Sequence, residues 1–327
     1  MPVILEPTPE NIAHCAERLR RGLSVAFPTE TVYGLGCDAS SEAAVAEVYA
    51  MKARPHNNPL IAHVTDAAMA KKAVVGWDVR AQRLAEAFWP GPLAIILPRR
   101  AEICALSVGG RTSVAVRAPA HPVARALIEA FGRPVSAPSA NRSGRISPTS
   151  AAHVAEDFAS FPELPILDGG PCEVGLESTV LDLSRARPMI LRPGAITAKE
   201  LEPIIGAVAA VDIGAQSASP GTSPSHYAPR TPTELVDEKL LASRLAAADK
   251  PIAVVAFAGT EVAAPHELYA LPRHAGAYAQ MLYSTLRRAD ASGAETIVIV
   301  APTERGGLWD AALDRVKRAC AKRSATA

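Results

Sequence analysis

Phe27-Pro-Thr-Glu-Thr-Val-Tyr-Gly-Leu-Gly-Cys-Asp38 is the stretch around which this chain is organised. It follows an apolar run, Leu23 to Phe27, which predicts a buried strand. Pro28 ends that strand because proline has no backbone N–H to donate to a neighbouring strand. Small hydroxyls and glycines at the end of a strand are what an α/β protein offers a bound ligand, because glycine permits positive φ or close approach of the backbone. An ordinary turn between a strand and a helix explains the same residues. The polar and glycine positions are Thr29, Glu30, Thr31, Tyr33, Gly34 and Gly36.

Length and composition narrow the class of protein. At 327 residues the chain is too long for one average core, which predicts two domains. Apolar residues make up 49% and charged residues 20%, an ordinary balance for a globular protein, and the net charge of +1 argues against a general polyanion binder. The five cysteines show no CxxC pairing, so we expect buried free thiols in a reducing cytoplasm rather than zinc or disulfides.

The ends and the hydropathy of the chain predict a cytoplasmic location without a membrane partner. The N-terminus has no basic end followed by an apolar core, so no signal peptide is visible. No apolar run approaches membrane-spanning length.

Alternating strands and helices predict an α/β fold throughout. Residues 1–206 form the first predicted domain, with a twisted mixed sheet, and residues 207–233 form a linker rich in Ser, Pro and Gly. Residues 234–327 suit a small Rossmann-like α/β domain, although they contain no Gly-x-Gly-x-x-Gly fingerprint and so predict no dinucleotide site.

The spacing of apolar residues and the residues that start and end helices and strands predict the positions of these elements. The predicted helices are Pro9–Arg21, Glu42–Met51, Val79–Phe88, His121–Phe131, Pro148–Phe158 with Ser147 as its N-cap, Glu238–Ala247, Ala275–Ala289 and Trp309–Cys320. The predicted strands are Leu23–Phe27, Leu60–Val64, Leu93–Leu97, Ser113–Arg117, Pro134–Ala137, Ser178–Leu183, Pro188–Leu191, Ile252–Phe257 and Thr296–Val300.

A set of cations, amides and hydroxyls in the first domain indicates a polyphosphate site. Lys52 and Arg54 lie two apart in a loop that Pro55 keeps extended, so both can point into one cleft, one as a point charge and one as a planar fork. The accompanying groups are Asn58, Ser139, Asn141 and Ser143. For Lys52 alone, a solvated helix end is the favoured interpretation, since cations favour a helix C-terminus.

Three further residues each have two interpretations. Arg117 closes an apolar strand and needs a partner there, either a substrate carboxylate or a protein carboxylate such as Glu30. His63 lies inside an apolar strand, which favours a hydrogen-bonded core residue over a catalyst. Ser147 is adequately explained as a helix cap, although a helix N-terminus also binds phosphate.

Several catalytic signals are absent from the sequence. It contains no Walker Gly-x-x-x-x-Gly-Lys-[Ser/Thr], no His/Cys metal cluster and no Gly-x-Ser-x-Gly elbow. The site therefore is expected to bind, orient and neutralise charge rather than to form a covalent intermediate.

Six motifs, in this order, resemble the YrdC-like family, and with the linker and second domain the chain resembles its long form, the L-threonylcarbamoyladenylate synthases. The motifs are Pro28-Thr-Glu-Thr-Val-Tyr-Gly-Leu-Gly36, Lys52-Ala-Arg54-Pro55 with Asn58-Pro59-Leu60, Trp89-Pro-Gly-Pro-Leu93, Ser139-Ala-Asn141-x-Ser143-Gly144, Ser178-Thr-Val180 and Leu191-Arg-Pro-Gly194. The resemblance implies a mixed-sheet domain with a deep cleft. It also implies a nucleotidyltransferase that converts L-threonine, bicarbonate or CO2, and ATP with Mg²⁺ into threonylcarbamoyl-AMP and pyrophosphate.

The resemblance also implies roles for particular residues. Those implied for L-threonine are Thr31, His63, Arg117, Ala137 and Ser178. Those implied for ATP are Lys52, Arg54, Asn58, Ser113, Ser139, Asn141, Ser147, Arg192 and Tyr227, of which Lys52, Arg54, Ser139 and Asn141 would serve catalysis. Tyr227, in the linker, would reach back over the nucleotide, and we hypothesise that the linker gates the site.

The implied product would pass to the machinery that transfers the threonylcarbamoyl group to tRNA, next to the anticodon; the sequence leaves direct contact with tRNA open. Two rival interpretations remain. One is an RNA-binding protein without catalytic activity, which the net charge of +1 and the few aromatics disfavour. The other is carbamoyl transfer to a different acceptor, which would be expected to bring acylphosphatase and zinc-finger segments that the sequence lacks.

Overall fold

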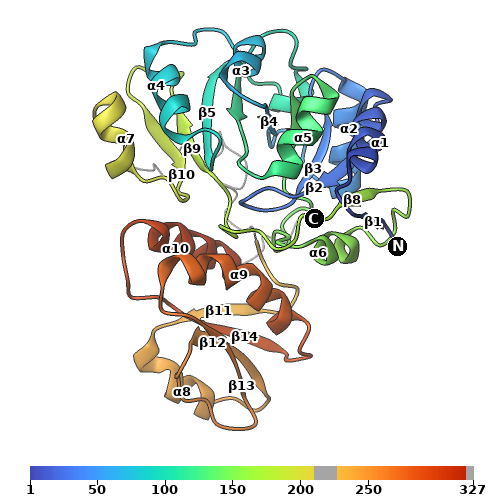
Figure 1. Ribbon diagram of the computed structural model, residues 1–327. Coiled ribbons are helices and arrows are strands. Elements are labelled where there is room, and N and C mark those ends of the chain that lie inside the picture. The colour runs from blue at the N-terminus through green and yellow to red at the C-terminus, as the bar shows by residue number, and fades with distance from the viewer. Residues whose placement is uncertain (210–226, 322–327) are drawn as a thin grey trace. The chain divides into compact units, whose positions relative to one another are not determined.

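The computed structural model describes residues 1–209 and 227–321, which divide into two compact units (Figure 1). Among these residues the first unit comprises 1–143 and 148–209, and the second comprises 144–147 and 227–321. Most of the predicted linker, residues 210–226, lies outside the described part of the chain. The domain boundaries at 206 and 234 stay predictions.

The first unit is built on a mixed sheet whose strands run in the order β1-β8-β2-β3-β7-β4-β6-β5-β9-β10. The neighbours β4 and β6, and likewise β5 and β9, are parallel, whereas β7 is antiparallel to β4, β5 to β6 and β10 to β9. The mixed α/β sheet expected from the sequence is confirmed. The strands are β1 Val3–Leu5, β2 Val25–Phe27, β3 Gly34–Asp38, β4 Ile61–His63, β5 Leu93–Pro98, β6 Ser113–Arg117, β7 Val135–Ala137, β8 Pro165–Leu167, β9 Thr179–Asp182 and β10 Met189–Arg192.

Alternation along β2 shows how helices cover both faces of one part of this sheet. Val25 and Phe27 pack with helices α1 and α5, whereas Ala26 packs with α2 and α6. A third cluster packs α3, α4 and α7 against β5, β6 and β9. The helices of this unit are α1 Pro9–Arg20, α2 Glu42–Lys52, α3 Ala67–Ala73, α4 Val79–Phe88, α5 Pro122–Phe131, α6 Ala151–Asp157 and α7 Ala198–Ile205, with a 3₁₀ turn η1 at Leu106–Val108.

One apolar cluster contains strand residues alone, among the residues described. Its members are Ile61, Ala94, Ile96, Ala115, Val180 and Leu191, which come from β4, β5, β6, β9 and β10. His63 and Arg117 lie two residues beyond Ile61 and Ala115, so they lie on the same face of the sheet. This face therefore offers an apolar floor with polar groups at its edge.

Gly34 to Asp38 corrects the prediction that the residues after Phe27 form a loop. They form strand β3, which pairs antiparallel with β2. Neither Gly34 nor Gly36 has positive φ. A Cβ on Gly36 would lie 2.7 Å from Phe27 Cε1 and 2.8 Å from Val135 Cγ1, so packing against these side chains explains the glycine.

The helix predicted to begin at Pro148 begins instead at Ala151, so the prediction that Ser147 is its N-cap is wrong. Ser150 is the N-cap, and its hydroxyl accepts from His153 N. The reason is that Pro148 O accepts from Tyr33 N at 2.9 Å. This hydrogen bond holds Pro148 against residues Phe27 to Asp38, which we call the central stretch, before the helix starts.

The second unit is a parallel four-stranded sheet in the order β11-β14-β12-β13, flanked by helices (Figure 1). Its strands are β11 Thr233–Val236, β12 Ile252–Phe257, β13 Glu267–Leu271 and β14 Thr296–Val300. Its helices are α8 Leu241–Ala246, preceded by the 3₁₀ turn η3 Glu238–Leu240, α9 Ala275–Asp290 and α10 Leu308–Ala319. Within residues 1–209 and 227–321, every helix is too short or too polar to cross a membrane.

Substituting Gly36→Ala is expected to destabilise the first unit by about 1–3 kcal/mol, because the added methyl overlaps Phe27 and Val135. Gly276→Ala is the matched control. Its Cβ would meet no atom closer than 3.4 Å, and alanine inside helix α9 is expected to be neutral or to stabilise by up to about 1 kcal/mol. Urea unfolding of both variants tests this account; equal effects would contradict it.

Candidate active site

The turn Thr29 to Tyr33 is closed by its own hydroxyls. Thr29 Oγ1 accepts from Val32 N at 3.2 Å and donates to Val32 O at 2.6 Å. Beyond the turn, Tyr33 O accepts from Ala140 N at 2.7 Å. The central stretch therefore contacts the 138–141 segment on one side, and it carries Glu30 and Thr31 on the other.

Arg117, at the end of β6, lies in the sheet with its guanidinium fixed at three nitrogens. Nη1 donates to Thr31 Oγ1 at 2.9 Å and Nε donates to Gly91 O at 3.2 Å. Nη2 forms an ion pair with Glu30 Oε1 at 2.6 Å, and both side chains are buried. The protein carboxylate considered as its partner is thus present. Among the residues described, two of the five N–H groups donate hydrogen bonds, which leaves three on Nη1 and Nη2 for Glu30 and a ligand.

His63 is the register neighbour of Arg117, because β4 and β6 are parallel and pair His63 with Arg117. Burial, together with the Arg117 charge, lowers the pKa of His63 from 6.5 to about 3, so the ring is neutral near pH 7. The expected burial is confirmed, but Nδ1 has no hydrogen-bond partner among the residues described. A hydrogen-bonded core role therefore does not account for this nitrogen.

Lys52, Ser139 and Asn141 come together. The Lys52 ammonium donates to Ser139 O at 2.6 Å and to Asn141 O. The solvated helix end favoured for Lys52 is wrong: Lys52 is the last residue of helix α2, before the C-cap Ala53 with φ 50°, but it is only 1% exposed. Burial, with Arg54 nearby, holds the pKa of Lys52 well below its ordinary value.

Arg54 and Asn58 form a second polar pair. Arg54 Nη2 donates to Asn58 Oδ1 at 2.7 Å and to Pro59 O at 2.9 Å, and Nε donates to Asn58 O at 3.0 Å. Arg54 is buried, so the guanidinium braces the turn that leads into β4 rather than extending into solvent.

Ser178 and Arg192 are also joined, although they were expected to serve different ligands. Arg192 Nη2 donates to Ser178 Oγ at 3.1 Å, and Nε donates to Ser178 O at 3.0 Å. Because β9 runs antiparallel to β10, the start of β9 and the end of β10 lie at the same edge of the sheet. That edge also carries the end of β6, since β5 is parallel to β9 and antiparallel to β6.

The remaining predicted residues belong to other parts of the fold. Ala137 ends β7 and pairs in register with Ile61, next to the apolar floor. Ser113 begins β6, so it lies at the opposite end of that strand from Arg117. Ser147 and Tyr227 belong to the second unit, where the Tyr227 ring is buried between the Tyr283 ring and the Arg315 guanidinium.

Sequence reasoning missed the loop that follows β8. Val174 N donates to Glu30 O at 2.8 Å, and Gly169 N donates to Tyr33 Oη at 3.1 Å, so this loop is tied to the central stretch. Asp168-Gly-Gly-Pro171 was the available signal for it. Within the loop, burial raises the pKa of Cys172 to about 12, which argues against a thiolate nucleophile.

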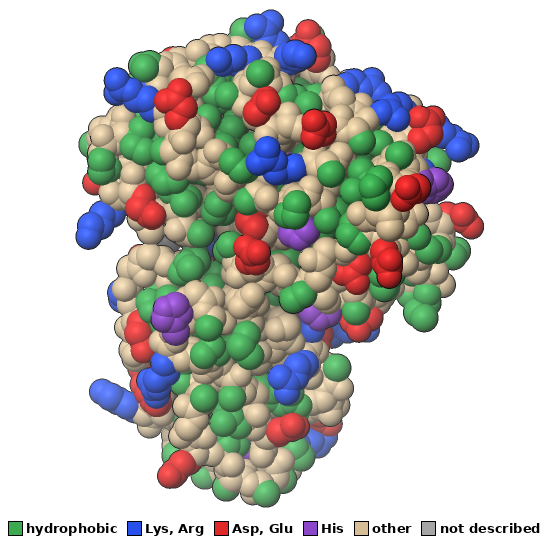
Figure 2. Space-filling model, viewed as in Figure 1, with side chains coloured by type: hydrophobic (Ala, Val, Ile, Leu, Met, Phe, Trp, Pro, Cys, Tyr) green, Lys and Arg blue, Asp and Glu red, His purple; other side chains and the backbone are tan. Residues whose placement is uncertain are grey.

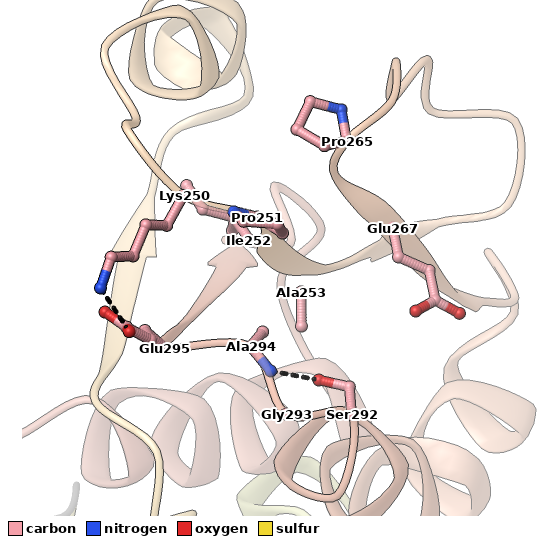
Figure 3. Close-up of a pocket in the computed structure, with 10 residues that line it drawn as sticks. All are labelled: Lys250, Pro251, Ile252, Ala253, Pro265, Glu267, Ser292, Gly293, Ala294 and Glu295. Carbon is pink, nitrogen blue, oxygen red and sulfur yellow. Dashed lines mark hydrogen bonds and ion pairs between the residues drawn. The ribbon is translucent and has the colours of Figure 1, made fainter.

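A concavity of about 290 Å³ lies in the second unit (Figure 3). Lys250 and Glu295 form an ion pair of 2.5 Å at its edge, and both side chains are mostly exposed. It lies at the amino ends of β12 and β14, whereas ligands of parallel sheets bind at the carboxyl ends. We therefore place the candidate active site in the first unit.

Two further properties limit the kind of ligand that this protein is expected to bind. On the face in Figure 2, basic and acidic side chains are interspersed, which does not favour a large polyanion surface. The described part of the chain has no cluster of three or more His, Cys, Asp or Glu side chains suited to a metal. The fold and site define an α/β protein built to bind a small anionic ligand.

Comparison with known proteins identifies the family. A Sua5/YciO/YrdC family profile, described as telomere recombination, matches residues 17–194, and a profile described as threonylcarbamoyl-AMP synthase, C-terminal domain, matches residues 196–321. The chain belongs to the Sua5/YrdC family, in its long two-domain form.

Two relatives illustrate the match. Threonylcarbamoyl-AMP synthase of Pyrococcus abyssi is 38% identical over 316 residues, 92% of this chain and 91% of the relative. The Bacillus subtilis enzyme of the same name is 43% identical over 231 residues, 69% of this chain and 66% of the relative.

Comparison with solved structures also shows similarity. P. abyssi Sua5 complexed with L-threonine has a TM-score of 0.89 at 36% identity, covering 98% of this chain and 97% of that one. Escherichia coli YciO, with a TM-score of 0.54 at 22% identity over 62% of this chain and 98% of that one, shares the fold.

The neutral state of His63 makes a pH-dependent contribution to stability. The unfolded chain binds a proton below about pH 6.5 while the folded chain resists it down to about pH 3, so stability falls as pH drops through this window. The added slope is at most about 1.4 kcal/mol per pH unit. Urea unfolding should show a steeper loss between pH 6.5 and 4.5 for the parent than for His63→Gln; parallel profiles would contradict a neutral His63.

Proposed function

We propose that this protein makes L-threonylcarbamoyl-AMP and pyrophosphate from L-threonine, bicarbonate or CO2, and ATP. The observation that carries the proposal is the buried Arg117 guanidinium, held beside Thr31 and His63 at the edge of the apolar floor. It supports binding of a small amino-acid carboxylate. The relative solved with L-threonine and the relatives named threonylcarbamoyl-AMP synthase supply the identity of the amino acid and of the product.

Threonine would bind with its carboxylate on N–H groups of Arg117 that donate no hydrogen bond to the described residues. Its methyl group would rest on Ala94 of the floor and on Ala137 next to it, and Ser178 directly precedes strand β9. Neutral His63 adds no second positive charge next to Arg117, and its Nδ1 can accept a hydrogen bond from the substrate. The amine stays free to react.

The reaction would proceed by two bond-forming steps. The neutral amine attacks CO2 and loses a proton, giving a carbamate. A carbamate oxygen then attacks the α-phosphorus of ATP, forming a mixed anhydride as the bond to the pyrophosphate oxygen breaks. Since carbamates and mixed anhydrides are readily lost to water, the site must exclude solvent.

The phosphates would lie near the Lys52 group. Among the residues described, the Lys52 ammonium donates to the neutral carbonyls of Ser139 and Asn141, so its charge is not neutralised through these bonds, and one N–H remains. Arg54, Asn58 and Arg192 would complete the nucleotide site, and the family resemblance also implies Ser113, Ser147 and Tyr227. These positions would stabilise charge on the departing pyrophosphate.

Mg²⁺ would arrive with ATP rather than as a resident cofactor. Among the residues described, the site offers hydroxyls, amides and cations but no cluster of carboxylates that could hold the ion, and Glu30 is already paired with Arg117. This donor set fits a magnesium ion held chiefly by substrate phosphates and water. The bound ion would neutralise phosphate charge.

The product would feed the threonylcarbamoyl modification of the adenosine next to the anticodon in tRNA. A mixed anhydride of a carbamate with AMP is an activated acyl donor, so a transferase must consume it. We propose that this enzyme, acting in the cytoplasm, supplies that transferase.

Arg117→Ala is expected to weaken threonine binding at least about 30-fold, because losing one partner of a buried charged contact costs about 2–5 kcal/mol or more. Titration calorimetry with L-threonine measures the effect. Serine, which lacks one methyl group, should bind the parent about 10- to 100-fold less tightly than threonine.

The matched control is Arg185→Ala. Arg185 is also paired with a buried carboxylate, Asp182, at 2.8 Å, but away from the site. It should bind threonine like the parent. Equal affinity for threonine in Arg117→Ala and the parent would refute this assignment, and salt-sensitive RNA binding with no threonine binding would favour the RNA-binding alternative.

A further inference from the structure

Glu30 is held at both carboxylate oxygens inside the first unit. Oε1 forms the 2.6 Å ion pair with Arg117 Nη2, and Oε2 accepts from Ala120 N at 3.0 Å. Its backbone carbonyl accepts from Val174 N at 2.8 Å, and the residue is 4% exposed. The protein's own groups therefore fix this carboxylate in place.

The orientation of Arg117 depends on this fixed carboxylate more than on its other contacts. Gly91 O and Thr31 Oγ1 are neutral acceptors, whereas Glu30 is the one charged group that contacts the guanidinium among the residues described. Charge-assisted contacts are shorter and stronger than neutral ones. A long flexible side chain that is already ordered loses less freedom when a ligand binds.

We infer that Glu30 is a positioning residue that orients the Arg117 guanidinium to receive the substrate carboxylate. The inference rests on the proposed function, because it assumes that the ligand of Arg117 is the carboxylate of threonine. Glu30 neutralises the buried cation, and N–H groups on Nη1 and Nη2 that donate no hydrogen bond to the described residues stay available for a ligand. It does not itself touch the substrate in this account.

A purely structural role for Glu30 predicts a different result. Through Ala120 N and Val174 N, the residue also ties together the loop before α5 and the loop after β8. If that were its whole function, its loss would weaken every ligand of the site alike. If it orients Arg117, its loss weakens specifically those ligands that carry a carboxylate.

The test is a cycle between Glu30→Gln and the substrate carboxylate, with binding measured by calorimetry for L-threonine and L-threonine amide. Glutamine preserves the shape and an oxygen for Ala120 N but removes the charge. In the parent, threonine should bind at least about 30-fold more tightly than its amide. In Glu30→Gln this preference should fall to about threefold or less, chiefly through weaker threonine binding.

Asp182→Asn is the matched control, because Asp182 is an equally buried carboxylate paired with Arg185 in the same sheet. It should retain the parent's preference. Equal weakening of both ligands by Glu30→Gln would overturn the inference in favour of a structural role. Tighter threonine binding would also overturn it, since Glu30 would then compete with the substrate for Arg117.

Glu30→Asp provides a second variant if the glutamine variant does not fold. Aspartate keeps the charge but draws the carboxylate back by one methylene, so the preference for threonine over its amide should fall partway; an unchanged preference would overturn the inference. Failure of the parent itself to bind threonine would refute the proposed function instead, so the two failures are distinguishable.

Discussion

The buried positive charge of Arg117 is the constraint on which the rest of this site depends. A guanidinium at the end of a buried strand requires acceptors, and the protein provides them from three separate segments: Gly91, Thr31 and Glu30. The central stretch must therefore turn back over the sheet, and the Thr29 hydroxyl closes that turn. The same requirement fixes the end of β6 next to the loop before β5. An ordered cation thus already stands ready for an anionic ligand.

The central stretch also connects the two ends of the proposed reaction. Glu30 and Thr31 hold Arg117, while a few residues later Tyr33 and Leu35 hydrogen-bond to the segment of Pro138 and Ala140. That segment supplies the carbonyls on which the Lys52 ammonium is held. The proposed carboxylate end and the proposed phosphate end of the site are therefore both joined to one short, buried piece of chain. Placing an amino acid and a nucleotide in register is the main catalytic task for such a site.

Much of this organisation could be predicted from the sequence, because apolar periodicity and punctuation are local properties. Helix α4 and strands β6, β12 and β14 have the predicted bounds. Long-range contacts explain the errors: Gly34 to Asp38 form a strand because they pair with β2 and β7, and helix α6 starts late because Pro148 O accepts from Tyr33 N. The Lys52 ammonium donates to backbone carbonyls, which no residue pattern reveals, and Glu30 could be named as a partner of Arg117 only as one of two alternatives.

The most direct test of the account is pyrophosphate release from ATP and Mg²⁺ by the full-length protein, measured with L-threonine and bicarbonate added separately and together. The account predicts release above background only when both are present, with one threonylcarbamoyl-AMP formed for each pyrophosphate. Release that is independent of threonine, or none from folded protein that binds both threonine and ATP, would contradict the proposed synthesis.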